Sequence, residues 1–208
     1  MDFFTSDQHF GHKNIIEYCN RPFSSISEMD KEIVRRWNSV VSENDTVYVL
    51  GDVSFYNTAL SKRIIKKLNG KKILVRGNHD SSHKRMKDMG FDETHDKLDY
   101  MLPDGRSALL WHYPLPDCLL EDYDILIHGH THCKPDDAIS GKKINVCVDA
   151  WEFTPLPVSK IASISSNTIR DDLCLVKKEN NMISINAQIH TEDIAGVFMY
   201  IKQIAYKD

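Results

Sequence analysis

Short apolar runs alternate with segments of helical periodicity along most of the chain. The runs contain few polar side chains, which is typical of strands that a sheet buries on both faces. We expect strands at 47–50, 72–75, 108–111, 125–127 and 144–148. A residue able to bind a metal or to transfer a proton follows each run closely. The sequence therefore predicts chemistry in the loops beyond the carboxyl ends of the strands.

Two segments between these runs carry apolar residues at helical spacing. The first is predicted to begin near Ser27, an N-cap residue with Asp30 three positions later, as in an acidic capping box. Its apolar face continues to Val41. The second covers 58–68, turns its basic side chains to water and ends before Gly70. Strands that alternate with such helices predict an α/β layered domain.

The pattern changes late in the chain. Two further strands are expected at 172–176 and 182–186, joined by a polar turn, and a helix is expected over 192–206. We therefore divide the chain into a domain of residues 1–162 and a C-terminal β-β-α extension of residues 163–208, which we expect to pack on the same domain. Packing, self-association and shaping of the substrate entrance are all compatible with the sequence of this extension.

The 208 residues are 41% hydrophobic and carry a formal charge of −4. This composition allows one core of ordinary size with a small appendage. The charge gives no case for a protein that coats nucleic acid, although bound divalent cations would reverse the field around a nucleotide substrate. The amino terminus does not resemble a signal peptide, no run can span a bilayer, and five scattered cysteines favour a reduced setting. We therefore expect a cytoplasmic protein without membrane attachment.

Five polar blocks supply seven side chains with oxygen or imidazole donors. The seven are Asp7, His9, Asp52, Asn78, His112, His130 and His132. This number exceeds what one ion needs and suits two ions that share a carboxylate, an arrangement that hydrolyses phosphate esters. Asp7 and His9 are two residues apart, so on an extended strand end both side chains leave from one face and can bind one ion. His130 and His132 repeat this spacing.

Taken singly, these residues also have structural explanations. His112 would be a satisfied buried histidine, and Asp52 after Gly51 would be a turn residue. We interpret the set as functional because folding alone gives no reason for all seven to occur together.

In order and spacing, the blocks resemble the calcineurin-like metallophosphoesterase superfamily: Asp-x-His, Gly-Asp, Gly-Asn-His-Asp, a single His and Gly-His-Thr-His. Segments 6–16 and 19–23 look like a small bacterial and phage branch of it. The resemblance covers about residues 1–162 and implies a two-layer β-sandwich flanked by helices, with two metal ions at its loop edge. The ligands it implies are Asp7, His9 and His132 for one ion, Asn78, His112 and His130 for the other, and Asp52 between them.

The resemblance implies an in-line attack on phosphorus by a hydroxide that bridges the two ions. Such ions lie about 3.5–4 Å apart and also stabilise charge on the phosphoryl oxygens. His79 follows Asn78 directly, so we expect it beside the metals, where it donates a proton to the leaving oxygen. Asp80 has two open roles: it orients the His79 ring, or it caps a helix over 81–89.

Weaker candidates for substrate contact lie beside the first and third blocks. His12, Asn14 and Arg21 lie on one connection, and Arg76 precedes the metal loop. His12 is equally placed to cap a helix starting near residue 13, and Arg76 to form a structural ion pair. A departure from the family is that Gly51-Asp52 runs into Val53-Ser54-Phe55, where many relatives place another Asp and often an Arg. This departure makes a protein phosphatase less favoured.

We therefore expect a binuclear metal-dependent phosphohydrolase, with a phosphodiester or other small nucleotide-like phosphoester as the favoured substrate. A phosphomonoesterase, a nuclease of the same fold and a non-catalytic metal-binding scaffold for a protein partner are the alternatives. The missing basic charge speaks against the nuclease, and the intact His79 speaks against the scaffold. Mn²⁺ is the first choice of metal, and Fe, Zn, Ni and Co also suit these ligands. The sequence does not indicate an oligomeric state.

Overall fold

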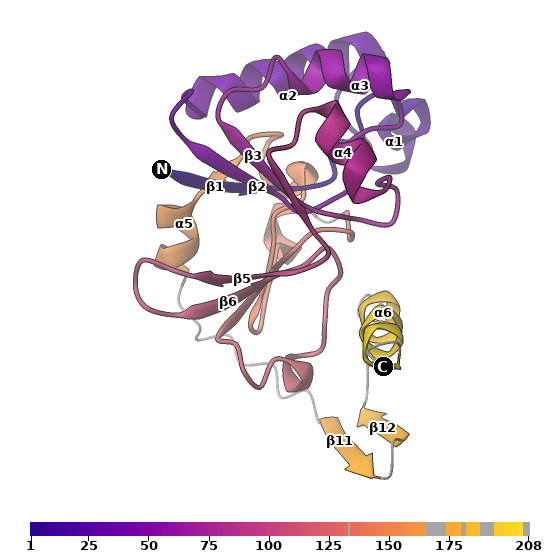
Figure 1. Ribbon diagram of the computed structural model, residues 1–208. Coiled ribbons are helices and arrows are strands. Elements are labelled where there is room, and N and C mark those ends of the chain that lie inside the picture. The colour runs from indigo at the N-terminus through magenta and orange to yellow at the C-terminus, as the bar shows by residue number, and fades with distance from the viewer. Residues whose placement is uncertain (133, 165–173, 180–181, 188–193, 206–208) are drawn as a thin grey trace.

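The structure is a computed structural model that describes residues 1–132, 134–164, 174–179, 182–187 and 194–205. Its centre consists of two five-stranded sheets. Helices cover the outer face of the first sheet, and the second sheet lies against the other face (Figure 1). The expected two-layer β-sandwich flanked by helices is confirmed.

The first sheet has the strand order β10-β1-β2-β3-β4. Its strands are β1 (Asp2–Thr5), β2 (Thr46–Val49), β3 (Lys71–Val75), β4 (Glu93–His95) and β10 (Leu156–Pro157). β1 to β4 are parallel, whereas β10 pairs antiparallel with β1. In the parallel register Phe4 lies opposite Tyr48, and Tyr48 lies opposite Ile73. The carboxyl ends of β1, β2 and β3 therefore meet at one edge.

The second sheet has the order β5-β6-β7-β9-β8. Its strands are β5 (Leu98–Met101), β6 (Ser107–Leu110), β7 (Ile125–His128), β8 (Ile139–Ser140) and β9 (Lys143–Asn145). β6, β7 and β9 are parallel, while β5 and β8 are antiparallel edge strands. The parallel strands again bring their carboxyl ends to one edge, and this edge faces the corresponding edge of the first sheet through an isolated bridge between Ser6 and Cys147.

Five helices accompany the two sheets. They are α1 (Lys13–Tyr18), α2 (Ile26–Val40), α3 (Thr58–Ile65), α4 (His83–Met89) and α5 (Val158–Ser163). Three short 3₁₀ turns occur at Asp117–Leu119, Pro135–Asp137 and Val148–Ala150. Figure 1 shows α2, α3 and α4 on the side of β1, β2 and β3 that faces away from β5 and β6.

Two buried apolar clusters follow from the alternation of side chains along β1. Phe3 points to the helical layer and packs in a cluster with Trp37, whereas Phe4 points between the sheets and packs in a cluster with Leu110. Successive residues of a strand face opposite sides, so one short strand contributes to both cores. Trp37 also donates its indole N–H to the carbonyl of Asn69, which connects α2 to the turn before β3.

Most predicted elements are confirmed, with differences of detail. α3 ends at Ile65, before the expected residue 68. α2 begins earlier than expected, because Ser25 is the N-cap and its hydroxyl accepts from the amide of Glu28. Asp30 is not a capping residue. Its buried carboxylate instead accepts from the amide of Gly11 and from the Tyr56 hydroxyl, partners that the local spacing cannot indicate. The run 144–148 forms β9 only as far as Asn145 and then turns.

The C-terminal extension contains the expected types of element. β11 (Cys174–Glu179) pairs antiparallel with β12 (Met182–Ala187), and α6 (Ile194–Ala205) follows. Some positions of the expected strand, turn and helix lie outside the described residues, namely 172–173, 180–181, 192–193 and 206. Met199 and Tyr200 of α6 pack against the cluster between the sheets. The boundary at residues 162 and 163 stays a prediction.

Two observations bear on the expected cellular setting. Within the described residues, no helix combines the length and the apolar character needed to cross a bilayer. Cys19 and Cys147 are free thiols, whereas Cys118 is disulfide-bonded. The expected reduced setting stays a prediction.

The core assignment predicts unequal costs for two Leu→Ala substitutions. Leu110 is fully buried between the sheets, whereas Leu60 on α3 is 39% exposed. Leu110→Ala should lower the free energy of unfolding by about 2–5 kcal/mol, because it removes buried methyl groups and leaves a cavity. Leu60→Ala should change it by about 0.5 kcal/mol or less. Urea denaturation of the metal-free proteins measures both, and equal losses would contradict the assignment.

Candidate metal centre

The seven candidate ligands occupy loops that follow five strands. Asp7 and His9 follow β1, Asp52 follows β2, Asn78 follows β3, His112 follows β6, and His130 and His132 follow β7. Because these strands end at facing edges of the two sheets, residues far apart in the chain come together. The fold thus brings together the side chains that the sequence analysis expects to converge. Two groups of donors can be distinguished within it.

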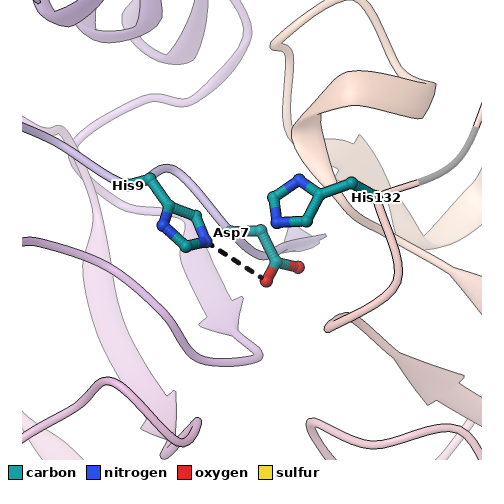
Figure 2. A group of neighbouring side chains, drawn as sticks. All are labelled: Asp7, His9 and His132. Carbon is teal, nitrogen blue, oxygen red and sulfur yellow. Dashed lines mark ion pairs between the residues drawn. The ribbon is translucent and has the colours of Figure 1, made fainter. Parts of the chain in front are cut away.

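The first group consists of Asp7, His9 and His132, whose donor atoms lie within 4.8 Å of one another. Figure 2 shows the three side chains directed towards a common point from two separate segments of the chain. Asp7 is fully buried and His9 is 3% exposed. Oδ1 of Asp7 and both ring nitrogens of His9 have no hydrogen-bond partner among the described residues. Buried polar atoms rarely stay unpaired, so a cation at this point would fit the donor set.

The second group consists of Asp52, His112 and His130, and Asn78 adjoins it. Nδ1 of His112 lies 2.7 Å from the carbonyl oxygen of Leu50, which can only accept, so this nitrogen carries the proton. The unprotonated Nε2 of a neutral His112 ring then faces the amide oxygen of Asn78 at 3.1 Å, while Nδ1 of His130 lies 3.2 Å away. Two acceptors face each other there, which is a favourable place for a divalent cation.

The carboxylate of Asp52, a member of the second group, also lies close to the first. Its Oδ2 is 3.8 Å from Nε2 of His9 and 3.6 Å from Nε2 of His112. Its Oδ1 accepts from the backbone amide of His79 at 2.9 Å. The residue predicted to bridge two ions therefore contacts one histidine of each group.

Four candidate ligands have left-handed backbone conformations. The φ angles are 59° for Asp7, 53° for His9, 56° for Asp52 and 68° for His130. Residues other than glycine adopt such angles rarely, and they cluster at functional sites where the surroundings enforce them. The prediction that Asp7 and His9 extend from a regular strand end is thus wrong in its geometry. Asp7 and His9 nevertheless share one donor group, whereas His130 and His132 belong to different groups.

Glycines next to the ligands permit the close approach of the loops. A Cβ on Gly77 would lie 2.9 Å from Cε1 of His112 and would also collide with the Asp52 carboxylate. A Cβ on Gly129 would lie 2.5 Å from Oδ2 of Asp7. The Gly-Asp, Gly-Asn-His-Asp and Gly-His-Thr-His blocks therefore need glycine for space at these contacts.

Asp80 takes neither of the two roles expected for it. Its carboxylate accepts from the backbone amides of Gly77, Asp52 and Val53 at 2.8, 2.9 and 3.1 Å. α4 begins at His83 with Ser82 in the N-cap position, beyond the reach of a cap at Asp80. Asp80 thus connects the loop after β2 to the loop after β3. Burial raises the pKa of its carboxyl group.

Arg21 differs from its expected role in substrate contact. Its side chain is fully buried and forms a two-point ion pair with Asp149 at 2.8 and 3.0 Å. It also donates to the carbonyl oxygens of Asp7 and Gln8 at 2.8 and 2.9 Å. Arg21 directs all of these hydrogen bonds into the protein, so it positions the loop that carries Asp7 and His9.

Asp149 is a residue that the sequence interpretation missed, although it follows the apolar run 144–148. Its Oδ2 accepts from Nδ1 of His132 at 2.7 Å, which orients that ring with Nε2 free for a ligand. Burial alone would lower the pKa of His132, but the hydrogen bonds to Asp149 and Cys19 and the charge of Asp7 raise it to about 10.

The remaining candidates lie around the rim. Arg76 forms an ion pair with Asp96 and donates to the carbonyl of Ser81 at 3.2 Å. This is the structural ion pair expected as the alternative to substrate contact. The ring of His12 stacks on Phe55 with centroids 4.1 Å apart, and it makes no capping hydrogen bond to α1. Asn14 donates to the Tyr18 hydroxyl at 3.4 Å on the exposed side of α1. Substrate contact by His12 and Asn14 stays a prediction.

Two sandwiched sheets with oxygen and imidazole donors at facing strand ends describe the class of metal-dependent hydrolases. Comparison with known proteins agrees. The family model described as the calcineurin-like phosphoesterase superfamily domain matches residues 4–147. The chain therefore belongs to the calcineurin-like phosphoesterase superfamily, whose members are metal-dependent hydrolases of phosphoric ester bonds and generally use divalent metal ions.

Three individual relatives support this membership. The uncharacterized protein MJ1445 of Methanocaldococcus jannaschii is 35% identical over 166 residues, covering 76% of this chain and 88% of that protein. The Gene 66 protein of Mycobacterium phage L5 is 31% identical, covering 71% and 86%. The crystal structure of the protein of unknown function AQ665 from Aquifex aeolicus matches with a TM-score of 0.65 and 32% identity, covering 78% and 97%. The phage relative agrees with the predicted small bacterial and phage branch.

The glycine contacts predict that added volume disturbs the centre. Gly77→Ala should lower divalent-metal affinity by about 10–100-fold, because its Cβ forces the loops after β2, β3 and β6 apart. Gly105→Ala is the matched control, since a Cβ there meets nothing within 4 Å. The control costs some stability through its φ of +87° but should load metal normally. Calorimetric titration with Mn²⁺ measures both, and equal affinities would contradict the close approach.

The raised pKa of His132 predicts proton release on metal binding. The metal-free ring stays protonated up to a pH of about 10, whereas a metal ligand must be neutral. At neutral pH, binding should therefore release about one proton at this residue. Calorimetry in two buffers of different ionisation enthalpy measures the release. Asp149→Asn should reduce it, because the pKa of His132 then falls; no release in the parent protein would exclude His132 as a ligand.

Proposed function

We propose that this chain is a binuclear metal-dependent phosphodiesterase that acts on a small nucleotide-like phosphoester. The observation that carries the proposal is the position of Asp52, whose carboxylate lies within 4 Å of His9 in one donor group and of His112 in the other. A shared carboxylate between two donor groups suits a pair of divalent ions rather than a single one.

The donor chemistry supports the expected allocation of ligands. Asp7, His9 and His132 would hold one ion, Asn78, His112 and His130 the other, and Asp52 would bridge them. When bound, such ions activate water for attack on phosphorus and neutralise charge on the phosphoryl oxygens. Mn²⁺ remains our first choice, while Fe, Zn, Ni and Co suit the same nitrogen and oxygen donors.

His79 is the proposed general acid. Its side chain is 47% exposed, in contrast to the buried Asp52 beside it, so the ring stands on the side open to substrate. Its Nε2 lies 3.9 Å from Oδ2 of Asp52. The backbone amide of His79 is held by Asp52, which fixes the point from which the ring projects. From there a protonated ring can hydrogen-bond a phosphoryl oxygen and deliver its proton to the leaving oxygen.

The need for an acid favours diesters of poor leaving groups. An alkoxide such as a nucleoside oxygen leaves slowly unless a proton is supplied, whereas an activated aryl oxide leaves without one. A half-exposed histidine beside an open donor cluster meets that need. The two positioning side chains, Arg21 and Asp149, hold Asp7 and His132 in place.

Removal of His79 tests the proposal. His79→Ala in the Mn²⁺-loaded protein should lower kcat for a dinucleoside phosphate by about 10²–10⁴-fold, because the proton donor is lost. Metal content should not change, since the ring lies outside the proposed ligand set. His83→Ala, which removes an exposed histidine on α4, is the matched control and should retain both properties. Chromatography measures the products and elemental analysis the metal.

Three results would count against these roles. Loss of metal in His79→Ala would place that ring among the ligands. A smaller loss with an activated 4-nitrophenyl diester is expected, so an equal loss would argue against proton donation. Absence of turnover by the parent protein with diesters and monoesters, across all five metals, would favour the scaffold alternative.

A further inference from the structure

A continuous series of aromatic rings borders the candidate centre. It consists of Tyr18, His12, Phe55 and His79 and is called the ring strip below. The centroids of Tyr18 and His12 are 6.4 Å apart, those of His12 and Phe55 are 4.1 Å apart, and those of Phe55 and His79 are 4.9 Å apart. The strip therefore runs from the proposed acid outwards to α1.

Phe55 is the centre of the strip. Its ring stacks nearly parallel to both His12 and the ligand candidate His9, at interplanar angles of 18° and 17°. It nevertheless stays 41% exposed, although large apolar side chains in this fold are mostly buried. An open aromatic ring therefore lies at the edge of the centre.

The outer end of the strip reaches a cavity. Tyr18 is 71% exposed, and it lines a cavity of about 340 Å³ together with Asn20, Lys134 and His132. His132 belongs to the first donor group, so the cavity and the centre share a side chain. Arg21, Asp149 and Phe153 also line it, so its wall combines aromatic rings, an amide, a carboxylate and cationic side chains. A flat substituent with polar edges matches this lining better than an alkyl chain or a bare sugar does.

We propose that Phe55 and the ring strip bind a planar, nucleobase-like substituent of the phosphoester. Stacking on aromatic rings needs only a flat π-face and therefore tolerates different bases. The strip begins at His79, so a base held on it belongs to a group attached to the reacting phosphate. The proposal rests on the proposed function for the reaction itself, but stacking can be measured without turnover.

The test compares two ligands that resist hydrolysis because carbon replaces the ester oxygen. Adenosine 5′-phosphonate carries a base, and ribose 5-phosphonate does not. The Mn²⁺-loaded protein should bind the adenosine compound about 5- to 150-fold more tightly, the range measured for single stacked bases. Phe55→Ala should remove most of this preference, and Phe55→Trp should restore it. Calorimetry gives the affinities.

Phe198→Ala is the matched control, because it removes a phenylalanine that is 70% exposed on α6, away from the strip. It should keep the parent preference. Affinities for the two ligands within twofold in the parent protein, binding of neither ligand, or an equal loss of both in Phe55→Ala would overturn the proposal. A base preference in a protein that hydrolyses no phosphoester would sustain this inference and refute the proposed function, so the two failures are distinguishable.

Discussion

The candidate centre depends most on the hydrogen bonds that the carboxylate of Asp80 accepts. This carboxylate accepts hydrogen bonds from amides of two loops, the one that carries Asp52 and the one that carries Asn78. A buried charge that satisfies three backbone donors both fixes those loops and removes their unpaired amides. Arg21 does the complementary work with opposite charge, because it binds the carbonyl oxygens of Asp7 and Gln8. The anionic Asp80 thus binds backbone amides, and the cationic Arg21 binds backbone carbonyl oxygens.

These contacts explain how the fold maintains unfavourable local structure. Left-handed backbone at Asp7, His9, Asp52 and His130 costs of order 1 kcal/mol or more at each residue. The unpaired polar atoms of Asp7 and His9 add a further penalty. Two apolar clusters, on either side of the first sheet, provide the stability that carries such costs. Binding of cations to the native donors would shift the folding equilibrium further towards the native state.

The sequence predicts which segments carry the candidate ligands better than it predicts the contacts that position them. The strands ending near Asp52, Asn78, His112 and His130 follow from short apolar runs, and parallel pairing brings their ends together. The local bends do not follow, because the preference of Asp7 and His9 for left-handed backbone comes from contacts with other loops. The structural roles of Asp80 and Arg21 do not follow from the sequence either. The partners of Asp80 are backbone amides, and those of Arg21 are backbone carbonyls and the distant Asp149, which no local motif reveals. The sequence feature that points to Asp149 is its position directly after the apolar run 144–148.

The approach of α6 to the sandwich has a consequence for how this enzyme can diversify. Gly196 lies so close to the carbonyl of Pro114 that any side chain there would collide with it. The neighbouring Tyr113 packs its ring against His112 and His130, with centroids 4.9 and 5.0 Å away. A substitution in α6 can therefore press on two imidazoles of the candidate ligand set through one tyrosine. Reactivity could thus be retuned during evolution from a segment outside the family domain, while every donor atom is conserved.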